Sequence, residues 1–463
     1  MAINGISSSS GHISIVIEDD IDTTDVEALQ DRMMNNLCGD LPFSNICCIF
    51  RVPQVLRRHN PKAYTPDVVS IGPFHRGREQ FQRMEIVKQW YLHNLLSRMN
   101  ISLKLLIEGI VRVENRAREF YSEPLDHLNQ NSFVEMMILD GCFLLELFRK
   151  FRDKKHRHIS DPIFSMDCMF QYICHDLLLL ENQIPWFVLN CLYTLTFDPK
   201  DDPSLRKLLL TVFSSHHQLA HNCRSYLRHL NNNVHDEDDD DDKILHILDL
   251  IRTSIVFPFK DQFDLSFYDS ETELMHPALA LSEAGVKFRR ASSTDTKSIM
   301  NIEFKDGTLA IPQLAIGELT DSLFRNLIAF EQCYPGHSHK ITSYAVLMDN
   351  LIGSSKDMEF LCEKKIIDNW LSAEDASKFF VKLYYDTVLN KFYYGGLCSK
   401  LNKHYDHKWK TWQEKFKRTY CSDPWKFISL TAAFILLLLT LLQTIYTVAQ
   451  TCNSENHHHY LCL

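Results

Sequence analysis

Along most of this chain, apolar residues recur every three or four positions, a spacing that places them on one face of an α-helix. The pattern predicts helices over residues 24–37, 84–100, 103–121, 203–214 and 243–253. Farther along the chain, the same spacing predicts three amphipathic helices and a longer one with an aromatic stripe, over residues 320–330, 341–352, 376–384 and 397–420. Thr320 is expected to cap the first of these four helices. The fold class is therefore mainly α.

Two stretches are apolar on nearly all sides, which is typical of helices buried in a core. The first is Phe133–Phe151. The second, Ile163–Leu195, predicts two helices that meet at a polar corner, with Pro185 in the first turn of the second helix. By contrast, residues 284–316 are short, β-like and punctuated by turns, so they predict a small β element. Residues 49–75 contain four prolines and therefore predict a loop-rich entry to the core.

The carboxyl-terminal region contains one long uncharged run. Phe427–Ala449 has no charged residue, and about 20 apolar residues suffice to cross a bilayer as a helix. Asp423 and Pro424 are suited to begin that helix, and lysines and arginines precede the run but do not follow it. We therefore expect a single-pass, tail-anchored membrane protein with a cytosolic amino-terminal domain, and the length of the run favours the plasma membrane.

Charge and composition divide the rest of the chain. The protein has 463 residues and a net charge of −10, which argues against a nucleic-acid partner. An unbroken acidic run, 236–242, predicts a solvated linker. The expected organisation begins with a disordered segment and a short helix (1–44). Two halves of a helical core (45–215 and 243–422) lie on either side of the linker (216–242). The membrane helix (423–449) and a non-cytosolic tail (450–463) follow.

The sequence offers few candidates for ligand chemistry. Gly72–Arg78, GPFHRGR, has the glycine spacing of a phosphate loop but lacks its Lys-Ser/Thr. His217 and His221 would share one face of a helix, and His457–His459 are adjacent, yet exposed histidines explain both sets. The cysteines form no CxxC pair, although Cys452 and Cys462 could form disulfides if the tail lies outside the cytosol. We therefore predict no cofactor, metal or catalytic residue.

Several polar residues interrupt apolar runs. Such groups either form acid–base pairs or, more often, hold helix ends and helix crossings. The candidate residues are Asp140, Glu181, Asn182, Gln183, Asn326 and Glu331. We expect a structural use, with Glu181 and Asn182 holding the corner before Pro185.

Six stretches, in order between residues 45 and 449, resemble the plant family catalogued as domain of unknown function 247. They are VPQVLRRHNPKAYTPDVVSIGPFH, MEIVK, LDGCFLLELF, LLLLENQIPWFVL, LTDSLFRNLIAFEQC and PWKFISLTAAF. The resemblance implies a plant-specific, largely helical protein that ends in one membrane span. The family has no established activity, so the resemblance implies no catalytic residue. Some grass members are associated with self-incompatibility loci, which favours recognition or signalling.

Three functions are compatible with these observations. The first is a non-enzymatic recognition or signalling protein with an unknown protein partner. The second is an enzyme whose site is built from the buried carboxylates, and converging carboxylates of raised pKa would favour it. The third is a lipid-handling or membrane-contact protein.

Overall fold

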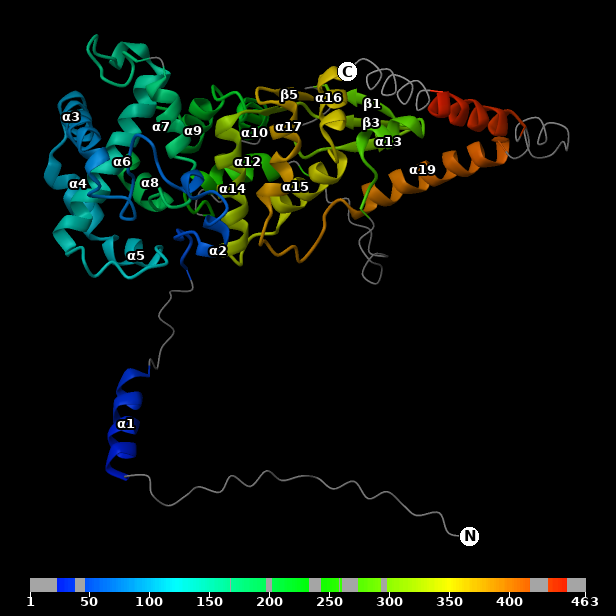
Figure 1. The fold of residues 1–463 in the computed structure, drawn as a ribbon. Coiled ribbons are helices and arrows are strands. Elements are labelled where there is room, and N and C mark those ends of the chain that lie inside the picture. Colours follow the sequence, from blue (N-terminus) through cyan, green and yellow to red (C-terminus); the bar gives the residue numbers. More distant parts are fainter. Residues whose placement is uncertain are drawn as a thin grey trace, which may run out of the picture. The chain divides into compact units, whose positions relative to one another are not determined.

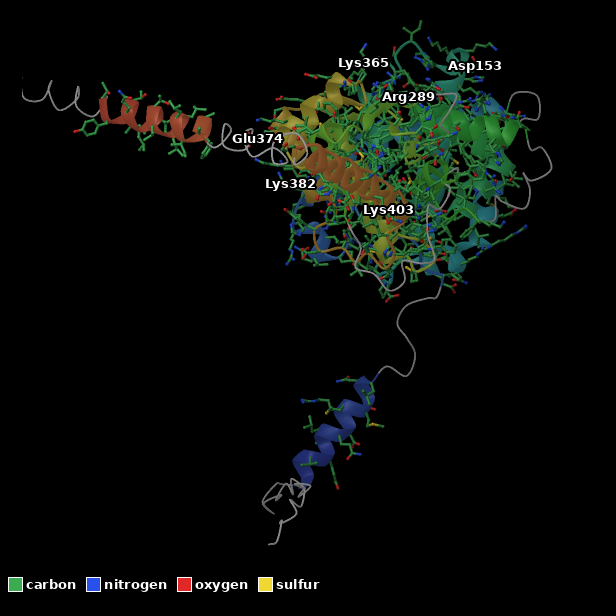
Figure 2. The ribbon with its side chains drawn as sticks, turned by 90° about the vertical axis from the view of Figure 1, so that its right-hand side faces the viewer. Asp153, Arg289, Lys365, Glu374, Lys382 and Lys403 are labelled. Carbon is green, nitrogen blue, oxygen red and sulfur yellow. The ribbon has the colours of Figure 1, made fainter. Side chains whose placement is uncertain are left out.

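The computed structural model describes most of the chain in two compact units, residues 1–45 and residues 46–463 (Figure 1). The described residues are 23–37, 46–166, 168–196, 202–232, 243–257, 259, 274–292, 298–416 and 432–447. In the first unit, α1 spans Thr23–Asn36 and confirms the helix predicted at 24–37. In the second unit, charged side chains such as Arg289, Lys365 and Glu374 are exposed (Figure 2).

The first half of the second unit is helical. Its helices and 3-10 turns are α2 (Gln54–Arg57), η1 (Pro61–Tyr64), η2 (Glu79–Phe81), α3 (Gln82–Met99), α4 (Leu103–Val111), α5 (Glu114–Glu119), α6 (Gln130–Arg152), η3 (Lys154–His156), α7 (Met169–Asp176), α8 (Trp186–Leu195), α9 (Leu205–Phe213) and α10 (Ala220–Asn232). The predicted helices at 84–100, 133–151 and 203–214 are confirmed. The helix predicted at 103–121 is instead two helices, because the backbone leaves helical geometry at Val113, between α4 and α5.

Helix α6 is the centre of this half. It contacts α3, α4, α8 and α9, and its residues from Phe133 to Lys150 are almost all buried. The side chain of Asn129 accepts a hydrogen bond from the Ser132 amide at 2.9 Å and so caps the helix. Gly141 permits close packing on α8, because a Cβ atom there would lie 2.4 Å from Leu192 Cδ1. An apolar surface on nearly all sides therefore marks a central helix, as the sequence predicts.

The second half adds helices and two small sheets. The elements are α12 (Ile247–Val256), α13 (Ala278–Glu283), β1 (Lys287–Arg290), β2 (Glu303–Lys305), β3 (Thr308–Ile311), β4 (Leu314–Ile316), α14 (Glu318–Cys333), α15 (Lys340–Leu351), α16 (Ser355–Glu363), β5 (Ile367–Asn369), α17 (Ala373–Ser377), α18 (Phe379–Leu383) and α19 (Gly395–Phe416). Strand β3 pairs in parallel with β1 and antiparallel with β2, and β4 pairs in parallel with β5. Asp306 and Gly307, both with positive φ, connect β2 to β3 as a two-residue hairpin turn.

Some local predictions in this half differ from the structure. The first amphipathic helix, α14, begins after Gly317, and the Thr320 hydroxyl accepts a hydrogen bond from the Gly317 amide at 2.9 Å. Thr320 therefore lies in the first turn of the helix and reaches back to its cap, instead of being the cap itself. The helix predicted at 376–384 is interrupted near Lys378, between α17 and α18. Leu397 and Leu401 of α19 are buried as expected, and the side chains of residues 408–416 lie outside the described set.

The stretch predicted as an acidic linker is partly helical. Within 216–242, α10 packs against α9 and α12 and buries Cys223 and Tyr226. The acidic run 236–242 itself lies outside the described residues. A single hydrophobic cluster contains residues from both sides of this stretch.

The predicted carboxyl-terminal membrane span is contradicted. Among the residues that the structure describes, no helix has the combination of length and apolar character needed to cross a membrane. Two parts of the expected span, 427–431 and 448–449, and the tail 450–463 lie outside the described residues. The single-pass, tail-anchored plasma-membrane prediction is therefore wrong.

Candidate functional site

The segment from residue 46 to residue 75 enters the core largely without regular structure. Apart from the short α2 and η1, its backbone has no helix or sheet to supply hydrogen-bond partners. Val69, Ile71 and Gly72 are nevertheless buried. A buried amide without a partner costs about 1–3 kcal/mol, so this segment requires acceptors from elsewhere in the chain.

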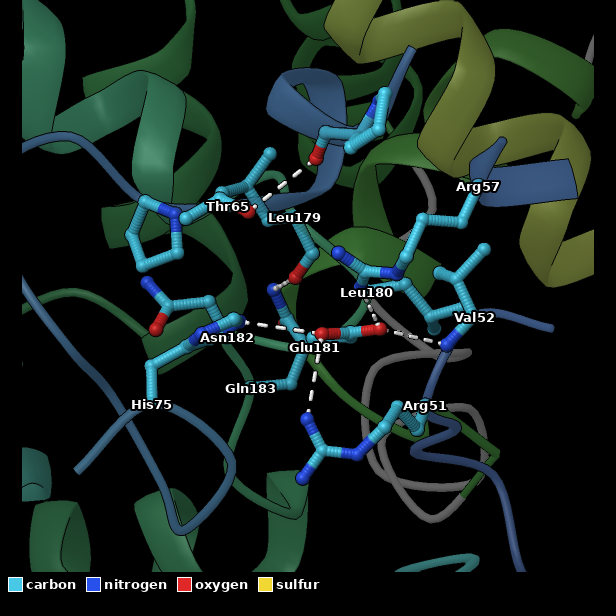
Figure 3. A network of polar contacts seen from close by, with 12 residues as sticks. Arg51, Val52, Arg57, Thr65, His75, Leu179, Leu180, Glu181, Asn182 and Gln183 are labelled. Atoms are coloured by element: carbon cyan, nitrogen blue, oxygen red, sulfur yellow. Dashed lines mark hydrogen bonds and ion pairs between the residues drawn. The ribbon is translucent and has the colours of Figure 1, made fainter. Parts of the chain in front are cut away.

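Glu181 supplies one of these acceptors at the polar corner (Figure 3). Its side chain is fully buried, and Oε1 accepts a hydrogen bond from the Val52 amide at 2.7 Å. Arg57 forms an ion pair with the same oxygen, while His75 Nε2 lies 3.3 Å and Arg51 Nη1 lies 3.8 Å from Oε2. Burial alone would raise the pKa of Glu181, but His75 and Arg57 outweigh it and lower that pKa. Glu181 is therefore a buried anion held by donors from the entry segment.

Asn182 and Gln183 continue the corner with neutral amide groups. Asn182 Oδ1 accepts a hydrogen bond from the Ile71 amide at 2.7 Å, and its Nδ2 donates to the Val69 carbonyl at 3.0 Å. Gln183 Nε2 donates to the carbonyls of Leu177 and Leu179 at 2.7 and 2.8 Å. These contacts satisfy a tight reversal between α7 and α8, as the sequence predicts for this corner.

Asp140 of α6 holds the next residue of the entry segment. Its Oδ2 accepts a hydrogen bond from the Gly72 amide at 2.8 Å, and Lys88 of α3 lies 2.7 Å from Oδ1. Burial raises the pKa of Asp140, and the Lys88 charge opposes that shift. Gly72 has a φ of +74°, and a Cβ atom there would lie 2.5 Å from the Gln183 carbonyl oxygen. The first glycine of GPFHRGR is therefore needed for close packing.

Asp176, the last residue of α7, is a member of this network that the sequence analysis missed. Its carboxylate accepts hydrogen bonds from the amides of Asp67, Val68 and Val69 at 2.9, 2.7 and 2.8 Å. The signal was available, because Asp176 directly precedes the four leucines of the corner and interrupts an apolar run in the same way as Asp140.

The remaining two candidates lie on α14. Asn326 Oδ1 accepts a hydrogen bond from the Leu180 amide at 2.9 Å and its Nδ2 donates to the Ala63 carbonyl at 2.7 Å, which joins it to the same network. Glu331 lies apart from it. Its carboxylate accepts hydrogen bonds from Arg252 and from the amides of Ile341 and Thr342, in the first turn of α15. It thereby caps that helix and lies at the positive end of its dipole.

The network is built to position backbone. The His75–Glu181 contact resembles a base with its orienting carboxylate, but both side chains are 0 % exposed, so in this conformation no substrate reaches them. The acidic side chains that face the entry segment, Asp140, Asp176 and Glu181, each accept at least one of its amides. This arrangement favours the structural use predicted for these residues.

The histidine pair considered for metal binding is not arranged on one helix. His217 precedes α10, which begins at Ala220, so it does not share a helical face with His221. His217 is exposed and instead lies beside Trp370, with ring centroids 5.5 Å apart. His457–His459 and the tail cysteines, Cys452 and Cys462, lie outside the described residues.

Comparisons with known proteins match nearly the whole chain. A family profile described as a plant protein of unknown function matches residues 49–439. The UPF0481 protein At3g47200 of Arabidopsis thaliana is 32% identical over 438 residues, which cover 88% of each chain. A second UPF0481 relative from the same plant is 22% identical over 491 residues, covering 85% of this chain and 89% of its own. No solved structure matches the chain. This protein therefore belongs to the plant family of unknown function catalogued as DUF247.

Proposed function

We propose that this protein is a non-enzymatic recognition or signalling protein that binds an amphipathic helix of a protein partner. The observation that carries the proposal is an apolar groove of about 460 Å³ between α3, α4 and α6. The structural use of the buried carboxylates supports a binding role over a catalytic one, since each is engaged in holding backbone or a cation.

The groove contains a regular apolar stripe. Leu103, Ile107 and Val111 line it at intervals of four residues along α4, and each is about two-fifths exposed. Val134 and Ile138 of α6 form its floor, where both are buried. Burying the exposed parts of the three α4 side chains would contribute about 1 kcal/mol each, because fully burying such a side chain contributes roughly 1.5–3 kcal/mol.

A helix suits this groove in shape and charge. Side chains four residues apart on α4 match the spacing of anchors on the apolar face of an amphipathic helix. Glu135 is the charged residue among those that line the groove, and its neighbours at the edge, Gln89 and Asn131, are polar. The complementary partner is therefore a helix with apolar anchors and a Lys or Arg placed to meet Glu135.

Proximity labelling in plant cells tests this proposal with a matched pair of variants. Ile107 and Leu105 are both 41% exposed on α4, but only Ile107 lines the groove. We expect Ile107→Lys to lose a reproducible set of labelled partners that the wild type and Leu105→Lys retain. Equal thermal stability of the two variants would show that the loss reflects recognition. The proposal is refuted if both variants keep the wild-type partner set. It is also refuted if no protein, the wild type included, labels a reproducible set of partners.

A further inference from the structure

Asp176 of the buried network lies together with two side chains that the network leaves unexplained, where the entry segment meets α7. Asp67 belongs to the entry segment, and His175 and Asp176 form the carboxyl end of α7. One possible ligand atom from each, a carboxylate oxygen or a ring nitrogen, lies within 4.8 Å of those of the other two. Asp67 is exposed, while His175 and Asp176 are buried, so the group is open to solvent on one side.

His175 is the unusual member of this group. It is only 5% exposed, and neither of its ring nitrogens has a hydrogen-bond partner. Its Nδ1 lies 3.9 Å from Asp176 Oδ1, too far for a hydrogen bond between them. A buried polar group without a hydrogen-bond partner is costly, and this imidazole lies beside two carboxylates that can share a ligand with it.

The carboxylate of Asp176 is already oriented by its surroundings. Three backbone amides of the entry segment, those of Asp67, Val68 and Val69, donate to it. Because the amide of Asp67 is one of these donors, the same bond that orients Asp176 also places Asp67 beside it. Fixed outer contacts of this kind are how proteins orient metal-binding carboxylates.

We propose that Asp67, His175 and Asp176 bind a divalent transition-metal ion, with Zn²⁺ as its representative. One imidazole nitrogen and two carboxylate oxygens make a three-ligand set that leaves a coordination position for water or a ligand. Zinc bonds of about 2.0–2.2 Å place ligand atoms roughly 3.4 Å apart in a tetrahedral site. The 3.9 Å between His175 Nδ1 and Asp176 Oδ1 would have to shorten by about 0.5 Å to reach this spacing. The separations that involve Asp67, which are at most 4.8 Å, would shorten if its exposed side chain turned toward the buried pair.

The ion would have an electrostatic role as well as a structural one. Two carboxylates in reach of one another repel, and a dication between them converts that repulsion into attraction. It would also join the entry segment to α7 through the Asp67 and His175 side chains, in addition to the hydrogen bonds from entry-segment amides to the Asp176 carboxylate. Neither role depends on the apolar groove, so this inference is independent of the proposed function.

Zinc uptake by the full-length protein tests the site. Protein stripped with EDTA is dialysed against Zn²⁺ at a free concentration set by a chelator buffer, and bound zinc is measured by mass spectrometry. Cysteine thiols and the adjacent histidines His457–His459 can also take up zinc, so the informative quantity is the difference in zinc content between each variant and the wild type. We expect the wild type to bind one equivalent more than either Asp67→Asn or His175→Ala.

The exposed residue Asp126 supplies the matched control, since Asp126→Asn removes a surface carboxylate outside the group. It should bind as much zinc as the wild type. Asp67→Asn changes an exposed side chain, so it keeps the test decisive even if His175→Ala fails to fold. Equal zinc content in all the proteins would overturn the site, and a loss confined to His175→Ala would overturn the three-ligand arrangement.

Discussion

The sharpest consequence of the buried network concerns Glu181. Replacing it by alanine removes the acceptor of the Val52 amide and leaves Arg57 and His75 facing an empty volume. Replacing it by glutamine keeps an oxygen for Val52 but removes the negative charge. The two substitutions therefore separate the loss of an acceptor from the loss of a charge.

The expected magnitudes follow from these contacts. A hydrogen bond to a charged group contributes about 1.5–3 kcal/mol, so Glu181→Gln should lower the free energy of unfolding by about 2 kcal/mol. Glu181→Ala additionally leaves the buried Val52 amide unsatisfied and creates a cavity, so it should cost about 3–5 kcal/mol. The pKa of Glu181 is lowered in the folded protein, so its stabilising effect is present above the unfolded pKa and is lost as pH falls through the folded pKa.

Two measurements check these values. Urea unfolding of the full-length protein reports the change in stability, and hydrogen exchange of peptides containing Val52 reports whether the entry segment loosens first. Glu123 is a matched control, because it pairs with Arg51 at 2.9 Å but is 44% exposed. Glu123→Ala should change stability by no more than about 0.5 kcal/mol. If Glu181→Ala behaves like Glu123→Ala, the anchoring role of the corner is refuted.

Three further predictions follow from the same contacts. Lys88→Met should lower the free energy of unfolding in urea by about 3–5 kcal/mol, because it leaves the Asp140 carboxylate buried without its cation. Adding Asp140→Asn should restore part of this loss. Gly72→Ala should lower the unfolding midpoint by more than a typical surface change, since both φ and the Gln183 carbonyl oppose a Cβ; an unchanged midpoint would contradict the close packing. Burial lowers the pKa of His246 to about 4, so between pH 6.5 and pH 4 the unfolded chain binds more protons at this residue than the folded chain does. Through this group alone, the free energy of unfolding at pH 5 should be about 2 kcal/mol below that at pH 7.

The sequence predicts those features that repeat locally. Helix α6 and the reversal between α7 and α8 follow from apolar periodicity and from a polar interruption, and both are found where expected, although Pro185 is the cap before α8 and not a residue of its first turn. The corner itself was correctly located, yet the partners of Glu181 were not, because Val52 lies 129 residues away in the sequence. Apolar spacing carries no information about which distant amide a buried carboxylate will meet.

The same limitation explains the other differences. Strand β5 begins 51 residues after its partner β4 ends, with helices between them, so no hairpin pattern in the sequence predicts the pair. The grouping of Asp67 with His175 likewise depends on how the entry segment folds back onto α7. In the carboxyl-terminal region, apolar composition predicted a span, whereas no helix among the described residues is long and apolar enough to cross a membrane.

The network also explains why these polar residues occur in a core that is otherwise largely apolar. A buried ion pair can often be replaced by apolar residues of similar volume with little loss of stability. That exchange is not open to Asp140, Asp176 or Glu181, because each accepts hydrogen bonds from backbone amides of the entry segment. An apolar side chain would fill the space but leave those amides without partners, and the amides cannot be removed by mutation except by proline. The irregular path of the entry segment therefore requires polar residues on α6 and at the α7–α8 corner, since the parts of the segment outside α2 and η1 must find hydrogen-bond partners on the elements they cross.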